Sequence, residues 1–336
     1  MPDDVLLLTD ADLRPLREVA SYMDEAMDVV VEATLALHRG VVTQANFNGR
    51  NQPGGRPSAR ITFATGDGLD TGIRTFGTPV RDQLGVLRDA NSRAFVLLDG
   101  ESGQVRAFMS YARLNPLRVG AIGGIAARHL AAPEARTLAV LGSGQQARTQ
   151  VQGICRAVPG ITNVRVYSPT EDHREAFAEA MASWLDVDVA AVGSVDEATR
   201  GAQIVTVAAS GRAQILAPSQ VEPGALVISV TGEGQLSEEF LDAASTVFVN
   251  WEAVADNFVT REPYQRRIHA GRLGKSDVTE LAALLAGEAG PPRRLPDDVV
   301  VFELTAVGAH DLAVARWVYD WARENHVGTP FSLAGD

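Results

Sequence analysis

Cysteine and lysine are nearly absent from this chain of 336 residues. The one cysteine, Cys155, cannot form an internal disulfide, and its neighbours Val151 and Ile154 indicate a buried thiol with a structural role. Because Lys275 is the only lysine, the other 29 of the 30 basic residues are arginine. Lysine chemistry is therefore excluded from the first half of the chain.

Two further absences narrow the class of protein. The net charge is −12 at pH 7, so the chain lacks the basic surface that a nucleic-acid partner requires. No apolar run is long enough to span a membrane, and the N-terminus lacks a basic region followed by an apolar stretch. With 46% hydrophobic and 21% charged residues, the composition is that of a globular protein. We expect a cytoplasmic protein with no nucleic-acid or membrane partner.

The most informative segment of the chain is 137–147, with the sequence TLAVLGSGQQA. Its apolar start predicts a short buried strand, and a helix-compatible run follows the glycines. Gly142 permits a tight turn, Gly144 lets the backbone approach the phosphates of a dinucleotide, and Ala147 replaces the third glycine of the fingerprint. The helix N-terminus adds unpaired N–H groups and a positive dipole end. The segment predicts a dinucleotide-binding turn; the alternative is a strand–helix turn that binds nothing.

The two parts of the chain follow different patterns. The first hundred or so residues predict a helix and an antiparallel sheet, whereas strand and helix patterns alternate from residue 115 on, which predicts a parallel, doubly wound α/β sheet. In the first part we expect a helix over 10–39, a loop over 49–56, strands over 60–64 and 72–76, and a hairpin over 93–109. In the second part we expect strands over 137–141, 163–167, 188–192, 203–207, 225–230 and 246–249, and helices over 117–131, 171–185, 195–200, 277–286 and 309–324.

Several segments of the chain together match a known family pattern: 97–104 (LLDGESGQ), 114–121 (LNPLRVGA), 141–147 (LGSGQQA), 230–234 (VTGEG) with 239–242 (EFLD), and 302–313. With these elements in order, the chain resembles the ornithine cyclodeaminase/μ-crystallin family of nicotinamide-dependent proteins. The resemblance implies a Rossmann-type dinucleotide domain, residues 118–304, inserted in an α+β substrate-binding and dimerisation domain built from 1–117 and 305–336. It also implies a homodimer joined through the N-terminal sheet.

The resemblance also implies how a substrate is held. Family members that act on amino acids bind the substrate carboxylate with two arginines, which by position are Arg60 and Arg118. Guanidinium groups suit a planar carboxylate because each can donate two parallel hydrogen bonds. The alternative for Arg60 is a solvated side chain on a strand.

Two positions depart from the family pattern, and both concern the groups closest to the chemistry. Where the cyclodeaminases place a lysine the chain has Arg74, and where they place a catalytic aspartate it has Glu233. A neutral lysine can move protons at an imine, whereas arginine stays charged and cannot act as a base. We therefore place both residues at the catalytic centre, Arg74 as a third anion-binding group and Glu233 as the acid–base group. Surface charges are the alternatives for both.

The end of the second strand of the dinucleotide domain bears on the choice of cofactor. In this fold an acid at that point holds the ribose hydroxyls of NAD, but here Ser168 follows the strand 163–167. Ser168 and Thr170 can donate hydrogen bonds to a phosphate, and Arg174 lies on the next turn, so the sequence predicts NADP(H) in preference to NAD(H). The expected cofactor contacts are Gly142, Ser143, Gly144, Gln145, Gln146, Ser168, Thr170, Arg174 and Thr231.

Three functions are open on these grounds. The first is an NAD(P)H-dependent reductase or dehydrogenase of amino acid metabolism, acting on a C–N bond of an imine or amino acid that carries a carboxylate. The second is a cyclodeaminase of the ornithine type, which needs proton transfers that the missing lysine disfavours. The third is a non-enzymatic, μ-crystallin-like protein that binds a ligand when nucleotide is bound. We expect the first, with a hydride carried by the cofactor and no metal ion.

Overall fold

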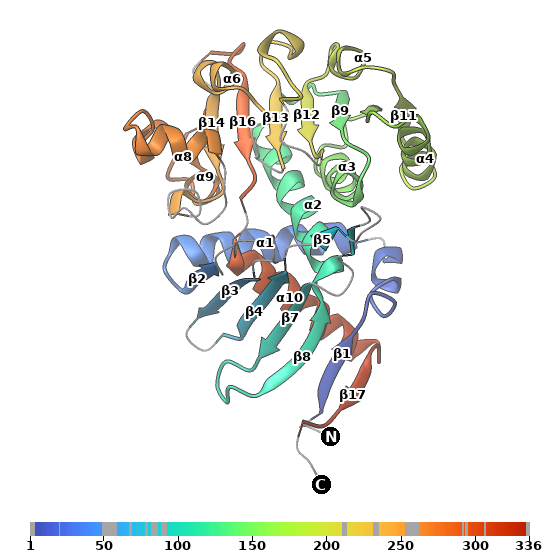
Figure 1. The fold of residues 1–336 in the computed structure, drawn as a ribbon, viewed down its shortest axis with the longest axis vertical. Helices are drawn as coiled ribbons and strands as arrows, with labels where there is room; N and C mark the ends of the chain where they lie inside the picture. The colour runs from blue at the N-terminus through green and yellow to red at the C-terminus, as the bar shows by residue number, and fades with distance from the viewer. Residues whose placement is uncertain are drawn as a thin grey trace. The chain divides into compact units, whose positions relative to one another are not determined.

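The computed structural model describes residues 4–19, 21–48, 59–66, 69–77, 80–81, 87–88, 93–209, 214–230, 235–252, 262–290, 292, 295–305 and 307–333 (Figure 1). The chain divides into two compact units. Unit 1 comprises Met1–Arg118 and Val307–Asp336, and unit 2 comprises Val119–Ala306. The polypeptide therefore leaves unit 1 once, builds unit 2 and returns.

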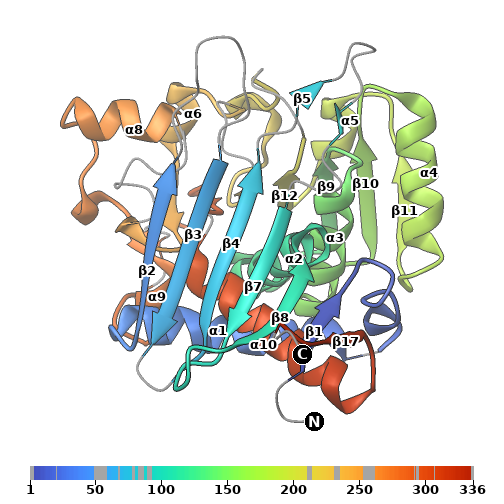
Figure 2. The same cartoon turned by 60° about the horizontal axis from the view of Figure 1, so that its bottom comes forward.

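Unit 1 consists of an antiparallel sheet with two long helices. Its elements are β1 (Val5–Leu8), a 3-10 helix (Pro15–Glu18), α1 (Tyr22–His38), β2 (Val42–Asn48), β3 (Ala59–Gly66), β4 (Thr71–Gly77), β5 (Val80–Arg81), β6 (Leu87–Arg88), β7 (Arg93–Leu98), β8 (Val105–Ser110), α10 (Gly308–Glu324) and β17 (Thr329–Phe331). Seven of the described strands pair in the order β17-β1-β8-β7-β4-β3-β2, and only the β1–β8 pair among them is parallel. Helix α10 packs against α1 and lies along strands β2, β3, β4 and β7 (Figure 2).

Both faces of this sheet carry apolar side chains. On the helix-covered face a Cβ added to Gly72 would lie 2.5 Å from Phe95 and 3.1 Å from Leu312, so α10 approaches the sheet closely there. On the opposite face the strand register aligns a row of apolar side chains across the sheet. This row consists of Leu7, Phe108, Val96, Ile73 and Phe63. Leu7 is 40% exposed and Ile61, one pair further along β3, is 41% exposed, so this second face is only partly covered within the chain.

Unit 2 is a doubly wound α/β structure. Its elements are the end of α2 (Tyr111–Leu130), β9 (Thr137–Leu141), α3 (Gln145–Ala157), β10 (Asn163–Tyr167), α4 (Glu171–Ala182), β11 (Asp188–Ala191), α5 (Val195–Thr199), β12 (Ile204–Val207), β13 (Leu226–Ser229), α6 (Glu238–Ala243), β14 (Ser245–Phe248), α8 (Glu262–His269), β15 (Thr279–Glu280), α9 (Leu281–Leu285) and β16 (Val300–Glu303). Strands β9, β12, β13 and β16 are buried along their whole length, as expected for parallel strands covered on both faces.

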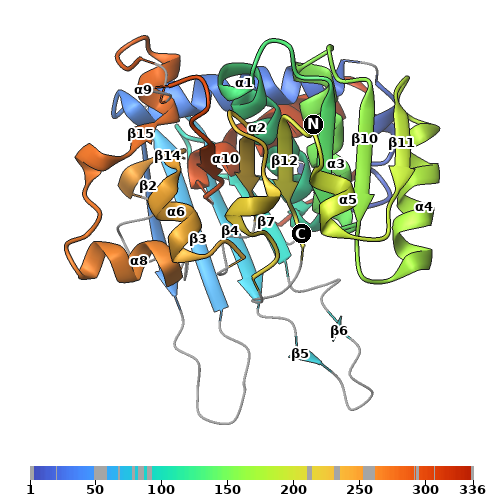
Figure 3. The ribbon, with the colours of Figure 1, turned by 90° about the horizontal axis from the view of Figure 1, so that it is seen from above.

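The strand order of unit 2 locates its binding edge. The eight described strands are all parallel and follow the order β11-β10-β9-β12-β13-β16-β14-β15. Figure 3 shows β10 and β11 side by side at one edge, next to α4. The direction of chain progression reverses between β9 and β12, and ligands of such sheets bind at the carboxyl ends of the strands at this point. The predicted fold class is therefore confirmed.

Three helices differ from the sequence prediction at their starts. The helix expected over 277–286 begins only at Leu281, because a 3-10 turn (Lys275–Asp277) and strand β15 precede it. The helix expected over 10–39 begins only at Tyr22, because 10–14 form turns and Pro15 opens a separate 3-10 turn. The helix expected over 117–131 begins earlier, at Tyr111, and contains Pro116 in its interior. Residues 114–127 are all buried, and this burial outweighs the backbone hydrogen bond that proline cannot donate.

Two expectations from composition can be compared with the structure. Burial raises the pKa of the Cys155 thiol to about 12, which agrees with a structural role because the reactive form of cysteine is the thiolate. No helix within the described ranges is long and apolar enough to cross a membrane. The cytoplasmic location stays a prediction.

Glycines let α2 and α3 approach each other in unit 2. A Cβ on Gly153 would lie 2.1 Å from the Gly120 carbonyl oxygen, and a Cβ on Gly120 would lie 2.4 Å from the Thr149 carbonyl oxygen. Real Cβ atoms do not come this close to backbone oxygens, so only glycine fits at both positions. The contact fixes the helix whose N-terminus follows the glycine turn.

We predict that Gly153→Ala lowers the free energy of unfolding by about 1–3 kcal/mol, because the added methyl group forces the two helices apart. Denaturant unfolding measures the effect. Gly290→Ala is the matched control, since a Cβ at Gly290 meets no atom within 4 Å. Equal stability of the two variants would contradict close packing at Gly153.

Candidate functional site

The predicted glycine turn lies at the carboxyl end of β9, beside the reversal of strand order. Gly142 has a φ of +120°, a value that favours glycine, and a Cβ there would lie 2.7 Å from the Ala208 carbonyl oxygen. Gly144 is the N-cap of α3, and a Cβ there would meet no atom within 4 Å. Gly142 is therefore required by the fold, whereas Gly144 leaves open space at a helix N-terminus.

A cavity of about 850 Å³ opens at this turn. The last residues of β9 and β10 and the residues after β12 line it, so it lies where a doubly wound sheet binds its ligand. The N–H groups at the start of α3 and the positive end of its dipole suit the pyrophosphate of a dinucleotide. The expected cofactor residues among those that line it are Gly142, Ser143, Gly144, Ser168 and Thr170.

Hydrogen bonds join the polar residues at the end of β10. The Ser143 hydroxyl donates to Ser168 Oγ at 3.0 Å, and Ser168 Oγ donates to the Thr170 carbonyl oxygen at 3.3 Å. Arg174 Nη1 donates to the Ser168 carbonyl oxygen at 3.3 Å, and Arg174 Nη2 lies 3.1 Å from the Glu171 carboxylate. The strand end thus carries hydroxyl groups and a guanidinium. Among the described residues, the only acid in contact with them is Glu171, the first residue of α4. Gln145 and Gln146 begin α3.

A second candidate site is a buried charged cluster in unit 1. Arg74 Nη1 donates to Asp311 Oδ2 at 2.9 Å and to the Tyr111 hydroxyl at 3.0 Å. Arg118 Nε lies 3.0 Å from Asp311 Oδ1. The exposed fractions are 7% for Arg74, 4% for Arg118 and 1% for Asp311. One carboxylate therefore bridges two guanidinium groups out of contact with water.

Helix α2 supplies three members of this cluster from one face. Tyr111, Asn115 and Arg118 follow the spacing i, i+4 and i+7, which brings their side chains together. The Tyr111 hydroxyl donates to Asp311 Oδ1 at 2.7 Å, and Arg118 Nη2 donates to Asn115 Oδ1 at 2.9 Å. The guanidinium of Arg74 also lies over the Tyr111 ring, 5.3 Å from its centroid. Each arginine is thus held by a neutral group as well as by the carboxylate.

The electrostatics of the cluster keep Arg74 protonated. Burial works to lower the pKa of Arg74, but its contacts with Tyr111 and Asp311 outweigh burial, and the pKa is raised. Burial also raises the pKa of the Tyr111 hydroxyl. At neutral pH both groups keep their protons, so neither is a base.

One edge of the Arg118 guanidinium is left for a ligand. Asp311 and Asn115 occupy the edge formed by Nε and Nη2. Nη1 is buried and has no hydrogen-bond partner among the residues that the structure describes. An unsatisfied buried donor costs about 1–3 kcal/mol, and more when it is charged. The free end of Arg118 therefore suits an anion such as a carboxylate.

Several predicted residues lie outside this description. Glu233 and Thr231 fall in the segment 231–234, which is outside the described residues. The side chain of Arg60 also falls outside it, and only the pairing of its backbone with Asn48 and Phe76 is described. Within the described ranges, no group of three or more His, Cys, Asp or Glu side chains could hold a metal ion.

Sequence reasoning missed three members of the cluster: Tyr111, Asn115 and Asp311. The helical spacing of Tyr111 and Asn115 to Arg118 was a usable signal, but the helix was expected to begin only at residue 117. Asp311 lies in the matching segment 302–313 and is the only acid in the first turn of α10. Its partners are 193 or more residues away in the chain, so no local pattern marks it.

The strand order, the glycine turn and the cavity define a dinucleotide-binding protein whose nucleotide unit is inserted in a second unit. The sequence profile of the ornithine cyclodeaminase/mu-crystallin family matches residues 77–326. The chain belongs to this family. The resemblance read from the sequence motifs is confirmed.

Relatives of the chain include enzymes with different substrates. It is 28% identical to alanine dehydrogenase of Archaeoglobus fulgidus, over 97% of this chain and 98% of the relative. It is 24% identical to a Delta(1)-pyrroline-2-carboxylate reductase of Bacillus cereus, over 93% of this chain and 94% of the relative. The prediction of an enzyme of the reductase, dehydrogenase or cyclodeaminase class is confirmed.

A solved structure shares the fold. The Delta(1)-pyrroline-2-carboxylate reductase of Thermococcus litoralis, in complex with NADH and L-proline, superimposes with a TM-score of 0.83 at 24% identity, over 97% of this chain and 99% of that one. At this identity the likeness supports the fold alone. It confirms the arrangement of a Rossmann-type sheet within the chain.

We predict that Gly144→Val weakens nucleotide binding at least about tenfold without lowering the melting temperature. The open space around Gly144 accepts the side chain, but the side chain then occupies the path of the pyrophosphate. Titration with NADPH and with NADH measures the affinity. Unchanged affinity would mean that the glycine turn has only a structural role.

Proposed function

We propose that the chain is an NADP(H)-dependent reductase or dehydrogenase that acts on a C–N bond of a substrate bearing a carboxylate. The observation that carries this proposal is the buried Arg118 guanidinium, whose Nη1 has no partner among the described residues. A carboxylate is the anion that fits a planar guanidinium edge, because it accepts two parallel hydrogen bonds. The relatives named above, which include a pyrroline-2-carboxylate reductase and an alanine dehydrogenase, support this substrate class.

The chemistry divides between cofactor and protein. A bound nicotinamide supplies or accepts the hydride at the substrate carbon. The protein's part is to hold the substrate carboxylate, through Arg118 and Arg60, and to move one proton at the substrate nitrogen. We assign that proton to Glu233 or to a water that it holds. An imine that gains a hydride at carbon and a proton at nitrogen becomes an amine, and the reverse sequence oxidises an amine.

Arg74 distinguishes this proposal from a cyclodeaminase. Its Nη1 hydrogens are engaged by Asp311 and Tyr111, and its pKa is raised. A group in this state binds anions and does not exchange protons. We therefore assign Arg74 to anion binding at the site. A cyclodeaminase reaction, whose ring closure needs several proton transfers, is less favoured.

We assign nucleotide binding to unit 2 and prefer NADP(H) as the cofactor. The support is the end of β10, where Ser168 and Thr170 line the cavity and Arg174 lies beside them. The Arg174–Glu171 pair involves a Glu171 side chain that is 68% exposed, and such a pair exchanges readily for a phosphate.

We assign substrate binding and homodimer formation to unit 1. The apolar row from Leu7 to Phe63 crosses the sheet on the face that α1 and α10 leave open. A second copy of the chain is the occupant that the family resemblance implies. Covering such a face removes partly exposed apolar side chains from water.

We predict that NADPH is oxidised when cyclic imino acids, or oxo acids with amines, are supplied.

Arg118→Ala should raise the KM of the carboxylate substrate about tenfold or more, because a charge-assisted contact is lost. Glu233→Gln should lower kcat by about two to four orders of magnitude and change substrate binding much less. NADPH absorbance follows both. Preference for an imine without a carboxylate would contradict the role of Arg118, and full activity of Glu233→Gln would contradict the acid–base role.

We predict that Ser168→Asp shifts the preference from NADP(H) toward NAD(H). The new carboxylate would repel the extra phosphate and accept hydrogen bonds from the ribose. Dissociation constants for both reduced cofactors measure the shift. If the unaltered protein already binds NADH about tenfold more tightly than NADPH, a difference of about 1.4 kcal/mol, the cofactor proposal is wrong.

A further inference from the structure

Asp311 supplies the carboxylate of the charged cluster in unit 1, and both of its oxygens have partners. Oδ2 accepts from Arg74 Nη1 at 2.9 Å, while Oδ1 accepts from the Tyr111 hydroxyl at 2.7 Å and lies 3.0 Å from Arg118 Nε. The residue is 1% exposed. Removing a carboxylate from water is costly, so this arrangement calls for a reason beyond stability.

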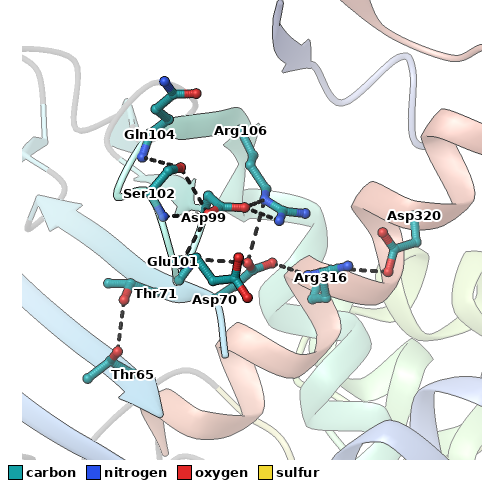
Figure 4. Close-up of polar contacts among 11 residues, drawn as sticks. Thr65, Asp70, Thr71, Asp99, Glu101, Ser102, Gln104, Arg106, Arg316 and Asp320 are labelled. Carbon is teal, nitrogen blue, oxygen red and sulfur yellow. Dashed lines mark hydrogen bonds and ion pairs between the residues drawn. The ribbon is translucent and has the colours of Figure 1, made fainter. Parts of the chain in front are cut away.

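A second buried carboxylate of unit 1, outside the cluster, also lies between two arginines (Figure 4). Asp70, which precedes β4, is 7% exposed and pairs with Arg316 of α10. It also lies 3.5 Å from Arg106 Nε. Arg106 pairs in turn with Asp99, and Arg316 with Asp320, which forms an alternating chain of charges.

Two ion pairs connect β4 and the residue before it to α10, and the acid and the arginine are exchanged between them. Asp70 at the start of β4 meets Arg316 of α10, and Arg74 within β4 meets Asp311 of α10. The close approach of Leu312 to Gly72 lies between them. Because the Asp70 pair and this apolar contact already tie β4 to α10, the fold does not depend on Asp311 for that attachment.

Asp311 instead affects the two arginines, Arg74 and Arg118, because it sets the net charge of the cluster and the position of their guanidinium groups. With one negative and two positive groups, the cluster carries a net charge of +1, which a single carboxylate of the substrate neutralises. Asp311 and Asn115 also occupy one edge of Arg118, so that only the end with Nη1 remains for a ligand. Without the shared carboxylate, two guanidinium groups that repel each other would have no common anchor.

We propose that Asp311 is a positioning residue, which holds Arg74 and Arg118 together and orients the free end of Arg118 toward the substrate carboxylate. The Tyr111 hydroxyl supports this arrangement, because it accepts a hydrogen bond from Arg74 and donates one to Asp311. The proposal depends on the proposed function in one respect, namely that Arg118 binds the substrate.

The test compares Asp311→Asn with Asp70→Asn in the full-length protein. Each change removes one buried charge between two arginines at the junction of β4 and α10. Asp311→Asn should raise the KM for the cyclic imino acid about tenfold or more, with a smaller fall in kcat. Asp70→Asn should leave the KM within about twofold of the value for the unaltered protein. This should hold even if its melting temperature falls by as much as that of Asp311→Asn. NADPH affinity should stay unchanged in both variants.

An equal rise in KM in both variants, or an unchanged KM in Asp311→Asn, would overturn the proposal. Tyr111→Phe provides a second variant if Asp311→Asn does not fold. It keeps all three charges of the cluster, removes the hydrogen bonds of the hydroxyl with Arg74 and Asp311, and should raise KM about two- to tenfold. An unchanged KM in Tyr111→Phe would argue against the role given to its hydroxyl.

A crystal structure of Asp311→Asn separates this proposal from the proposed function. The Arg118 guanidinium should leave its 2.9 Å contact with Asn115, whether or not a substrate has been found. If no imino acid is reduced by the unaltered protein, the proposed function fails while this displacement is still expected. An Arg118 side chain that stays in place would overturn the positioning role.

Discussion

A charge that is shielded from water must be paired, and in unit 1 this requirement links three distant parts of the chain. The Asp311 carboxylate reaches Arg74 from a strand and Arg118 from a helix, and neither guanidinium could stay in that interior alone. Helix α10 is already held against β4 by the Asp70–Arg316 pair and by the contact of Leu312 with Gly72, and this attachment brings the Asp311 carboxylate to Arg74. The architecture of unit 1 therefore makes the pairing possible.

Unit 2 depends on a different constraint, the approach of backbone to backbone. At Gly142 and Gly153 a single added carbon would collide with a carbonyl oxygen, whereas at Gly144 it would find open space. The first two glycines shape the turn and pack the helix, and the third leaves room beside the helix N-terminus. This difference separates the glycines that the fold requires from the glycine to which we assign a role in nucleotide binding.

The sequence predicted the parts of the fold that have a local pattern. Strands β9 and β10 occur at their predicted bounds. The buried strand β9 is a nearly continuous apolar run, whereas β10 alternates between buried valines and partly buried residues, and both strands end at turn residues. The edge strands β1 and β17 were not predicted, since they are short and obtain their order from pairing partners far along the chain.

The candidate site was predictable to the same extent. Arg74 and Arg118 were selected by their positions in the motifs, and the structure brings them together at one carboxylate. Asp311 and Tyr111 could not be selected in this way. Asp311 meets its partners only through tertiary contacts, and no local pattern marks it. Tyr111 had a usable signal in its helical spacing to Arg118, which was missed because the helix was expected to begin at residue 117.

The order of the chain has a consequence for synthesis on the ribosome. Asp311 follows Arg74 by 237 residues, and the whole of unit 2 is translated between them. Strand β17, which pairs with β1, is translated later still. The nascent chain therefore exposes two uncompensated arginines and an unfinished sheet while unit 2 is already free to fold. Because contacts of such long sequence separation form slowly, unit 1 is the part whose completion would limit maturation of the protein.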